Sequence, residues 1–148
     1  MRRWVFITGL AQPWVRDVTA VQCSTEQKSM DSAAILSQHL GLPYATHDAL
    51  GENDRTSTGF LPPPEFERMA DAFFGQPRQS VRGWERAIDA QRRIVAAVQA
   101  IDRIDTTPGT LAIVSVHMLR RQTIDAPLLR GAGWIAGLVG FATLSQML

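Results

Sequence analysis

Three short runs of β-favouring residues constrain the fold of this chain more than any other sequence feature. They are residues 4–8 (WVFIT), 18–23 (VTAVQC) and 110–115 (TLAIVS). The first and last are nearly continuous apolar runs, a pattern typical of strands that a parallel sheet buries on both faces. Segments with helical patterns lie between the second run and the third. This order predicts an α/β fold in three layers, with a mostly parallel sheet flanked by helices.

Capping signals and apolar spacing predict three helices between these runs. Ser24 followed by Gln27 is a capping-box pattern, which predicts a helix over residues 24–40 that ends at a glycine. Two further helices are predicted over residues 64–74 and 81–104, and the second of these is the longest in the chain.

The segment between the first two predicted helices is polar and rich in turn residues. Residues 48–64 include three consecutive prolines, which cannot lie inside a helix or a central strand. We therefore expect a long surface excursion, and loops of this length in compact domains are often functional.

Composition narrows the class of protein. A length of 148 residues suits one domain, and a net charge of +1 provides no broad basic face for nucleic acid. One cysteine excludes an internal disulfide, and three scattered histidines give no metal-binding motif. The start of the chain does not fit a signal peptide, so the expected location is the cytoplasm.

Candidate binding residues gather where the predicted strands end. Ligands of parallel sheets bind outside the carboxyl ends of the strands, where this sequence places Thr8, Ser24 and His117. Ser24 at a helix N-terminus, with Lys28 four residues later, suits an anion. The alternative interpretation is an ordinary helix cap beside a solvated lysine.

Three other side chains could supply chemistry at the same edge. Glu52 in the excursion could protonate a leaving oxygen, or it could simply form an ion pair with Arg55. His117 follows a strand and could act as nucleophile, acid–base or ligand, or it could be a histidine satisfied at a strand end. Cys23 could be a nucleophile, but no phosphate-binding loop follows it, and a small buried side chain is the simpler interpretation.

Four segments together resemble the histidine phosphatase superfamily, the phosphoglycerate-mutase-like proteins. They are residues 23–36, 50–63, 80–86 and 111–115. The resemblance implies a phosphoglycerate-mutase-like fold and hydrolysis of a phosphomonoester through a phosphohistidine. It implies a phosphorylated small molecule or a phosphoprotein as partner, and it implies no cofactor.

The resemblance is partial at the family's nucleophile. Gly9 stands where the resemblance implies the nucleophilic histidine, and the chain then leads almost directly into the second strand. The fold is therefore expected to be incomplete relative to the family, with a helix and its loop missing after Thr8.

The other functional positions match unevenly. Lys28 stands where the resemblance implies a phosphate-binding arginine, and it keeps the charge without the bidentate fork. Glu52 matches the implied acid. Val116 displaces His117 by one residue from the second histidine position, and such an offset turns a side chain to the other face of a strand.

The resemblance stops after residue 115. It gives an expected domain over residues 1–115 and a divergent segment over residues 116–148. The last 18 residues, 131–148, carry no charge, and Gly133 and Gly137 form the G-x-x-x-G spacing that lets helices approach closely in lipid.

Three functions therefore stay open. The favoured hypothesis is a histidine-phosphatase-like protein that is catalytically impaired because its nucleophile is absent. The first alternative is an active phosphatase with Glu52 and His117 as catalytic residues, while Ser24, Lys28 and Arg55 bind phosphate. The second alternative is a non-enzymatic interaction or membrane-associated protein that acts through residues 131–148. Each hypothesis is compatible with a homo-oligomer, and membrane attachment is the least favoured.

Overall fold

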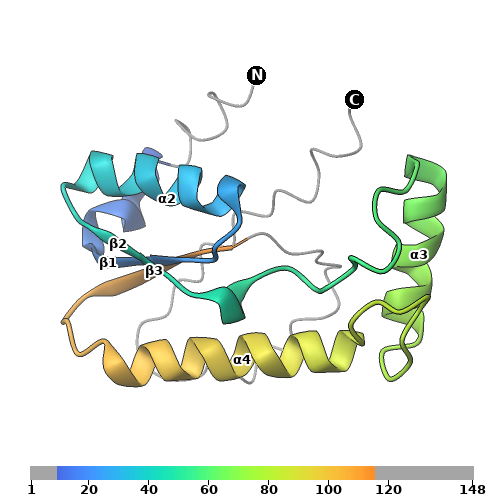
Figure 1. The fold of residues 1–148 in the computed structure, drawn as a ribbon. Helices are drawn as coiled ribbons and strands as arrows, with labels where there is room; N and C mark the ends of the chain where they lie inside the picture. The colour runs from blue at the N-terminus through green and yellow to red at the C-terminus, as the bar shows by residue number, and fades with distance from the viewer. Residues whose placement is uncertain (1–9, 116–148) are drawn as a thin grey trace.

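A computed structural model describes residues 10–115 of the chain (Figure 1). Its elements follow in this order: η1 (Pro13–Asp17), β1 (Val18–Cys23), α2 (Gln27–Leu40), β2 (Tyr44–Thr46), η2 (Asp48–Leu50), α3 (Pro63–Gly75), α4 (Ala87–Ile104) and β3 (Thr110–Val114). The three strands form one parallel sheet in the order β2–β1–β3. The predicted strand over residues 4–8 and everything after Ser115 lie outside the described residues.

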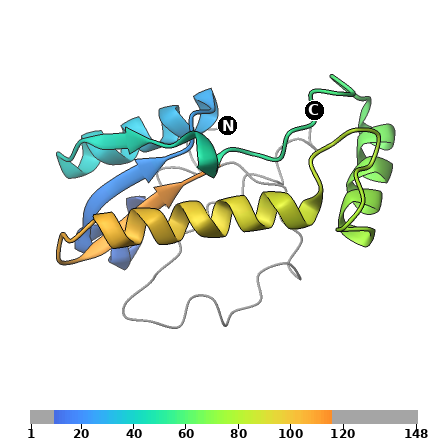
Figure 2. The ribbon, with the colours of Figure 1, turned by 60° about the horizontal axis from the view of Figure 1, so that its bottom comes forward.

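The layers of the predicted α/β fold are confirmed. In Figure 2 the helix α2 lies on one side of the sheet and α4 lies on the other. The strand predicted over residues 18–23 is β1, with Val18, Val21 and Cys23 buried. The strand predicted over residues 110–115 is β3, which ends one residue earlier. Sequence reasoning missed β2, because its three residues are exposed at the edge of the sheet and carry no apolar pattern.

The predicted start of α2 is wrong by three residues. The helix begins at Gln27, its N-cap is Glu26, and Ser24 does not cap it. Ser24 instead extends the end of β1, since its amide donates to the Val114 carbonyl at 3.0 Å. Its hydroxyl is fully buried and donates to Ser29 Oγ at 2.7 Å. The tertiary contact with β3 therefore overrides the local capping pattern.

The predicted start of the longest helix is also wrong. Residues 80–86 form turns, and α4 begins at Ala87. Arg82 and Gly83 have positive φ angles of 49° and 85°, which no right-handed helix allows. A Cβ on Gly83 would lie 2.9 Å from Ser57 Cβ, so this turn packs against the excursion. The apolar spacing alone could not reveal the break.

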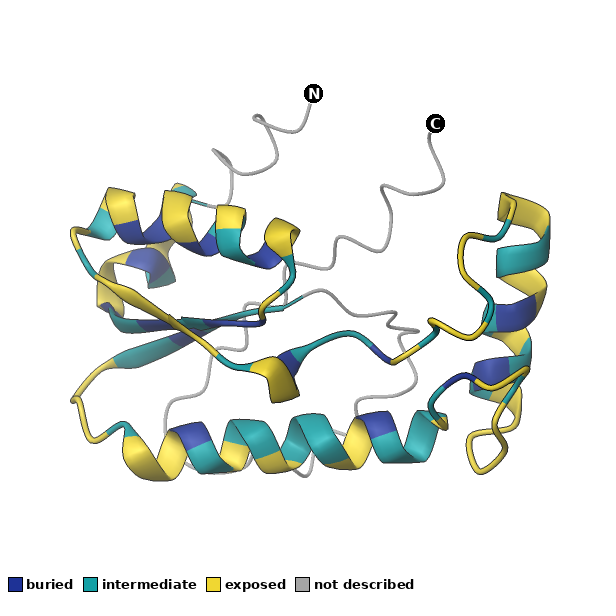
Figure 3. Cartoon of the chain, in the orientation of Figure 1, coloured by how far each residue is buried: buried dark blue, intermediate teal, exposed yellow. Residues whose placement is uncertain are grey.

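Two separate hydrophobic cores hold the described residues. The sheet core lies between β1, β3 and α2 and consists of Val15, Val18, Val21, Cys23, Ala33, Leu36 and Ala112. The α3 core consists of Met69, Phe73 and Trp84. Figure 3 shows the buried residues of α3 well apart from those of the sheet, with α4 running between the two regions. Besides α4, the predicted excursion over residues 48–64 connects the sheet region to the α3 region.

Candidate functional site

The excursion begins at the carboxyl edge of the sheet, where the sequence predicts a site. The His47 amide donates to the carbonyl of Cys23 at 2.8 Å, which aligns the start of η2 with the end of β1. The Ser115 hydroxyl donates to the Leu50 carbonyl at 2.5 Å, which aligns the end of η2 with the end of β3. Leu50 is buried beneath this contact. Parallel strands thus place the segment that carries Glu52 at the edge where such folds bind ligands.

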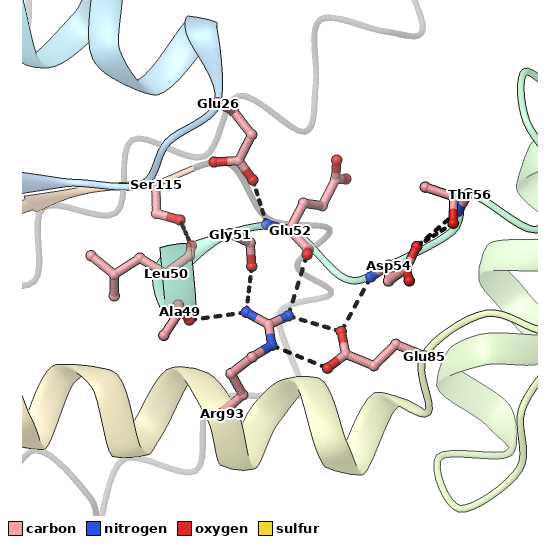
Figure 4. Close-up of polar contacts among 10 residues, drawn as sticks. All are labelled: Glu26, Ala49, Leu50, Gly51, Glu52, Asp54, Thr56, Glu85, Arg93 and Ser115. Carbon is pink, nitrogen blue, oxygen red and sulfur yellow. Dashed lines mark hydrogen bonds and ion pairs between the residues drawn. The ribbon is translucent and has the colours of Figure 1, made fainter. Parts of the chain in front are cut away.

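Arg93 anchors the segment before and at Glu52 from the side of α4. It lies on α4, and its guanidinium donates to the carbonyls of Ala49 and Gly51 at 2.9 Å each and to the carbonyl of Glu52 at 3.3 Å. The same guanidinium pairs with Glu85 through contacts of 2.8 and 3.1 Å (Figure 4). Glu85 raises the pKa of Arg93 above its usual value by hydrogen bonding and charge. A permanently charged fork with five donors suits this task, which a lysine cannot perform.

Glu26, at the N-terminus of α2, anchors the same segment from the opposite side. Its Oε1 accepts a hydrogen bond from the Glu52 amide at 2.5 Å. A Cβ on Gly51 would lie 3.2 Å from the same oxygen and 3.0 Å from the Asp48 carbonyl, so a glycine fits this close approach. The second oxygen, Oε2, is buried and has no hydrogen-bond partner in the described structure. The backbone at Glu52 is therefore held from two sides.

The side chain of Glu52 is directed away from this anchor. In Figure 4 its carboxylate points away from the Arg93 guanidinium. Its Oε2 accepts from Arg55 Nη2 at 2.8 Å, and the side chain is 20 % exposed. Arg55 also lies over the Phe66 ring, 5.1 Å from its centroid. The ion pair expected between Glu52 and Arg55 is therefore present, and it engages one of the two carboxylate oxygens of Glu52.

The predicted phosphate-binding residues differ in their accessibility. Lys28 is exposed in the first turn of α2, so its ammonium group is accessible to an anion in solution. Arg55 is 37 % exposed and is engaged by Glu52. Ser24 is fully buried, with both its amide and its hydroxyl bonded inside the protein. A phosphate role for Ser24 would require these bonds to be exchanged, and for all three residues phosphate binding stays a prediction.

Several sequence predictions fall outside residues 10–115. They concern Gly9, His117 and the uncharged segment over residues 131–148, so the convergence of His117 with Glu52 stays a prediction. Arg82, a further arginine that could neutralise phosphate charge, pairs with Glu65 at 2.6 Å on the surface.

Cys23 is a buried side chain of the sheet core. It is fully inaccessible to solvent. Burial raises the pKa of its thiol above the usual value, and the nearby charge of Glu26 raises it further. A thiol with a raised pKa and no access to solvent is a poor nucleophile, which supports the simpler interpretation.

Sequence reasoning missed the residues that hold the site together. Glu26, Glu85 and Arg93 are ordinary charged residues at helical or turn positions, and no motif distinguishes them from solvated ones. Within residues 10–115, no group of three histidine, cysteine, aspartate or glutamate side chains could hold a metal ion. No helix in that range is long and apolar enough to cross a membrane.

The described residues adopt a phosphoglycerate-mutase-like α/β fold. Two solved structures carry this comparison. The chain is similar to YhfR from Bacillus stearothermophilus with a TM-score of 0.55 and 22% identity, over 77% of this chain and 55% of that one. It is similar to a protein named Mycobacterial hydrolase 1 with a TM-score of 0.56 and 17% identity, over 68% of this chain and 53% of that one.

The match covers only part of these structures. This chain spans about half the length of both. No family model matches the sequence, and no curated protein matches it. The likeness therefore concerns the fold, and the activity has to be argued from the residues.

Proposed function

We propose that this chain is a histidine-phosphatase-like protein that can bind phosphorylated ligands but hydrolyses phosphomonoesters poorly. The observation that carries the proposal is a mismatch between two parts of the implied site. The segment that bears the acid candidate Glu52 is held at the carboxyl edge of the sheet by Arg93 and Glu26. The position of the implied nucleophile holds Gly9, which has no side chain to attack phosphorus.

The chemistry explains why this loss matters. In the implied reaction an imidazole nitrogen forms a P–N bond while the ester P–O bond breaks, and an acid protonates the leaving oxygen. Water then cleaves the P–N bond and releases phosphate. Positioning and charge can lower the barrier of both steps, but they cannot replace the nucleophile.

The direct test is turnover of p-nitrophenyl phosphate by the full chain. We expect a rate close to that of buffer, and we expect Glu52→Gln to change it little because the acid has no nucleophile to assist. Restoring the nucleophile with Gly9→His is expected to raise the rate, and Gly9→Ala is the matched control. Robust turnover by the unaltered chain would contradict the proposal.

A second candidate is an active phosphatase that uses His117. It is supported by Ser115, whose hydroxyl bonds the Leu50 carbonyl two residues before Glu52, so the chain enters the segment after β3 beside the acid candidate. Lys28 and Arg55 would then neutralise the phosphoryl charge. Turnover that disappears in His117→Ala but persists in His39→Ala would favour this candidate, since His39 lies in the last turn of α2.

A further inference from the structure

A groove runs between the sheet and the last turns of α4, away from the candidate site. It has a volume of about 470 Å³. Its walls come from β1, from β2 with the residues next to it, and from the C-terminal end of α4 with the turn that follows; they include the apolar Tyr44, Ala45, Ile101 and Ile104 and the polar Thr19, Asp105 and Thr107. In Figure 1 this region lies at the end of α4 that leads into β3. The groove is a feature of the α4 side of the sheet, and the sheet core lies on the α2 side.

The groove is mainly apolar, with one charged residue, Asp105, at its edge, and it is incompletely covered. Ile104 is 81% exposed and Tyr44 is 39% exposed, and both rank among the large exposed hydrophobic residues of the described chain. Only Ala90 and Ile101 are buried among the 18 residues of α4, although its apolar side chains follow helical spacing. Among the polar lining residues, Gln22 and His47 bond one another at 2.7 Å, and Asp105 accepts a hydrogen bond from the Thr107 amide at 3.0 Å, so these groups already have partners within the chain. An apolar surface of this kind favours an apolar occupant.

The chain itself contains a matching segment. Residues 131–148 carry no charged side chain and include Trp134, Leu138 and Phe141. Four glycines among these 18 residues permit a close approach of backbone to the groove. We propose that residues 131–148 dock in this groove and complete the apolar layer between the sheet and α4.

The connecting length allows this contact within one molecule. Residues 115–130 separate β3 from the segment, and a chain of about 16 residues reaches up to about 50 Å when extended. The tether also raises the effective concentration of the segment at the groove to the order of millimolar. Docking within the same chain is therefore favoured over capture of a second copy or of a membrane at ordinary protein concentration.

Cross-linking of the full chain tests the proposal. Cysteines are introduced at the groove and in the segment with Ile104→Cys and Leu138→Cys, and a short bis-maleimide is added. We expect a cross-link within single chains, seen as a compacted monomer band. The matched pair is Ile35→Cys with Leu138→Cys, because Ile35 is 45% exposed on α2, outside the groove. Equal cross-linking in both pairs, or cross-links only between two chains, would overturn the proposal.

Hydrogen exchange supplies a second measurement that does not depend on cysteines. We expect Ile104→Lys to accelerate amide exchange of residues 131–148 by about tenfold or more, because it places a charge in the groove. Ile35→Lys, which changes an exposed isoleucine of α2, is expected to leave that exchange unchanged. If the segment exchanges at the same fast rate in the unaltered chain and in Ile104→Lys, or if it becomes protected only when vesicles are added, docking in the groove is wrong.

Discussion

The two cores of the molecule differ in how they are built. The sheet core is assembled from small and aliphatic side chains on strands and one helix that are far apart in sequence. The α3 core is assembled around aromatic rings. The ring centroid of Trp84 lies 6.1 Å from that of Phe66 and 6.1 Å from that of Phe73. The sheet core needs precise strand register, whereas the α3 core depends on one large anchor. Neither core contains the candidate site, which is held by the charged contacts that join the two regions.

The joint between the cores is formed by few side chains. Trp84 Nε1 donates to Thr58 Oγ1 at 2.8 Å and ties the excursion to the α3 core. Glu85, the next residue, pairs with Arg93, which in turn holds the start of the excursion beside the sheet. Adjacent residues thus connect the aromatic core to the segment of Glu52.

The largest effect is expected from Trp84→Ala. Removing a fully buried tryptophan costs about 3–5 kcal/mol of stability, and here it also removes the ring that packs against Phe66 and Phe73. Hydrogen exchange of residues 61–86 is expected to accelerate strongly while β1 stays protected. The matched variant Trp84→Phe retains a ring and should lose less. Equal acceleration in β1 would show that the two cores unfold as one unit.

Arg93→Ala is expected to have the next largest effect. It leaves the carbonyls of Ala49, Gly51 and Glu52 without their donor and Glu85 without its partner, at a cost of about 3 kcal/mol. Chemical denaturation measures the loss. Arg92→Ala is the matched control, because Arg92 is 72% exposed and its ion pair with Asp89 is long, at 3.9 Å, so it should cost little. Similar losses of stability in both variants would show that the contacts of Arg93 with the excursion make no specific contribution.

Cys23 offers a pH-dependent probe of the sheet core. Its pKa is raised in the folded chain, so above the ordinary thiol pKa of about 8.5 the unfolded chain releases a proton that the folded chain retains. Stability should therefore be unaffected by this thiol below that pH and should fall as the pH rises above it. The free energy of unfolding of the chain and of Cys23→Ala, measured from pH 7 to pH 10, checks this. A parallel decline in both would assign the effect to another group.

The smallest effect is expected at the surface of the α3 region. Arg82 and Glu65 form an ion pair of 2.6 Å, with side chains 55% and 37% exposed. Exposed pairs of this kind contribute at most about 1 kcal/mol. Glu65→Gln should therefore change the denaturation midpoint only slightly, and added salt should reduce even that change. A loss as large as that of Arg93→Ala would show that charge, not aromatic packing, holds this region together.

Local patterns predicted β1, β3 and the presence of the helices, but they missed β2, and the strand predicted over residues 4–8 lies outside the described residues. The segment of β3 is recognisable as a nearly continuous apolar run, and that of β1 as a run rich in β-favouring residues. The starts of α2 and α4 were predicted wrongly, because Ser24 bonds β3 and Gly83 packs against Ser57. Both contacts join residues far apart in sequence, which no capping pattern describes.

The candidate site was predictable only at its exposed parts. The pairing of Glu52 with Arg55 follows from their spacing of three residues. The anchoring by Arg93 does not, because it bridges about forty residues to main-chain carbonyls that every residue possesses. The buried, unpartnered oxygen of Glu26 was equally hidden, since its burial depends on how η2 meets the end of β1.

The central claim is that the acid candidate is held in place while the nucleophile is missing. A single-turnover reaction with a radiolabelled phosphomonoester, quenched in alkali, tests it most directly, because phosphohistidine is stable to alkali and labile to acid. We expect no protein-bound phosphate on the unaltered chain. Acid-labile phosphate bound in stoichiometric amount, and lost in His117→Ala, would contradict it and establish His117 as the nucleophile.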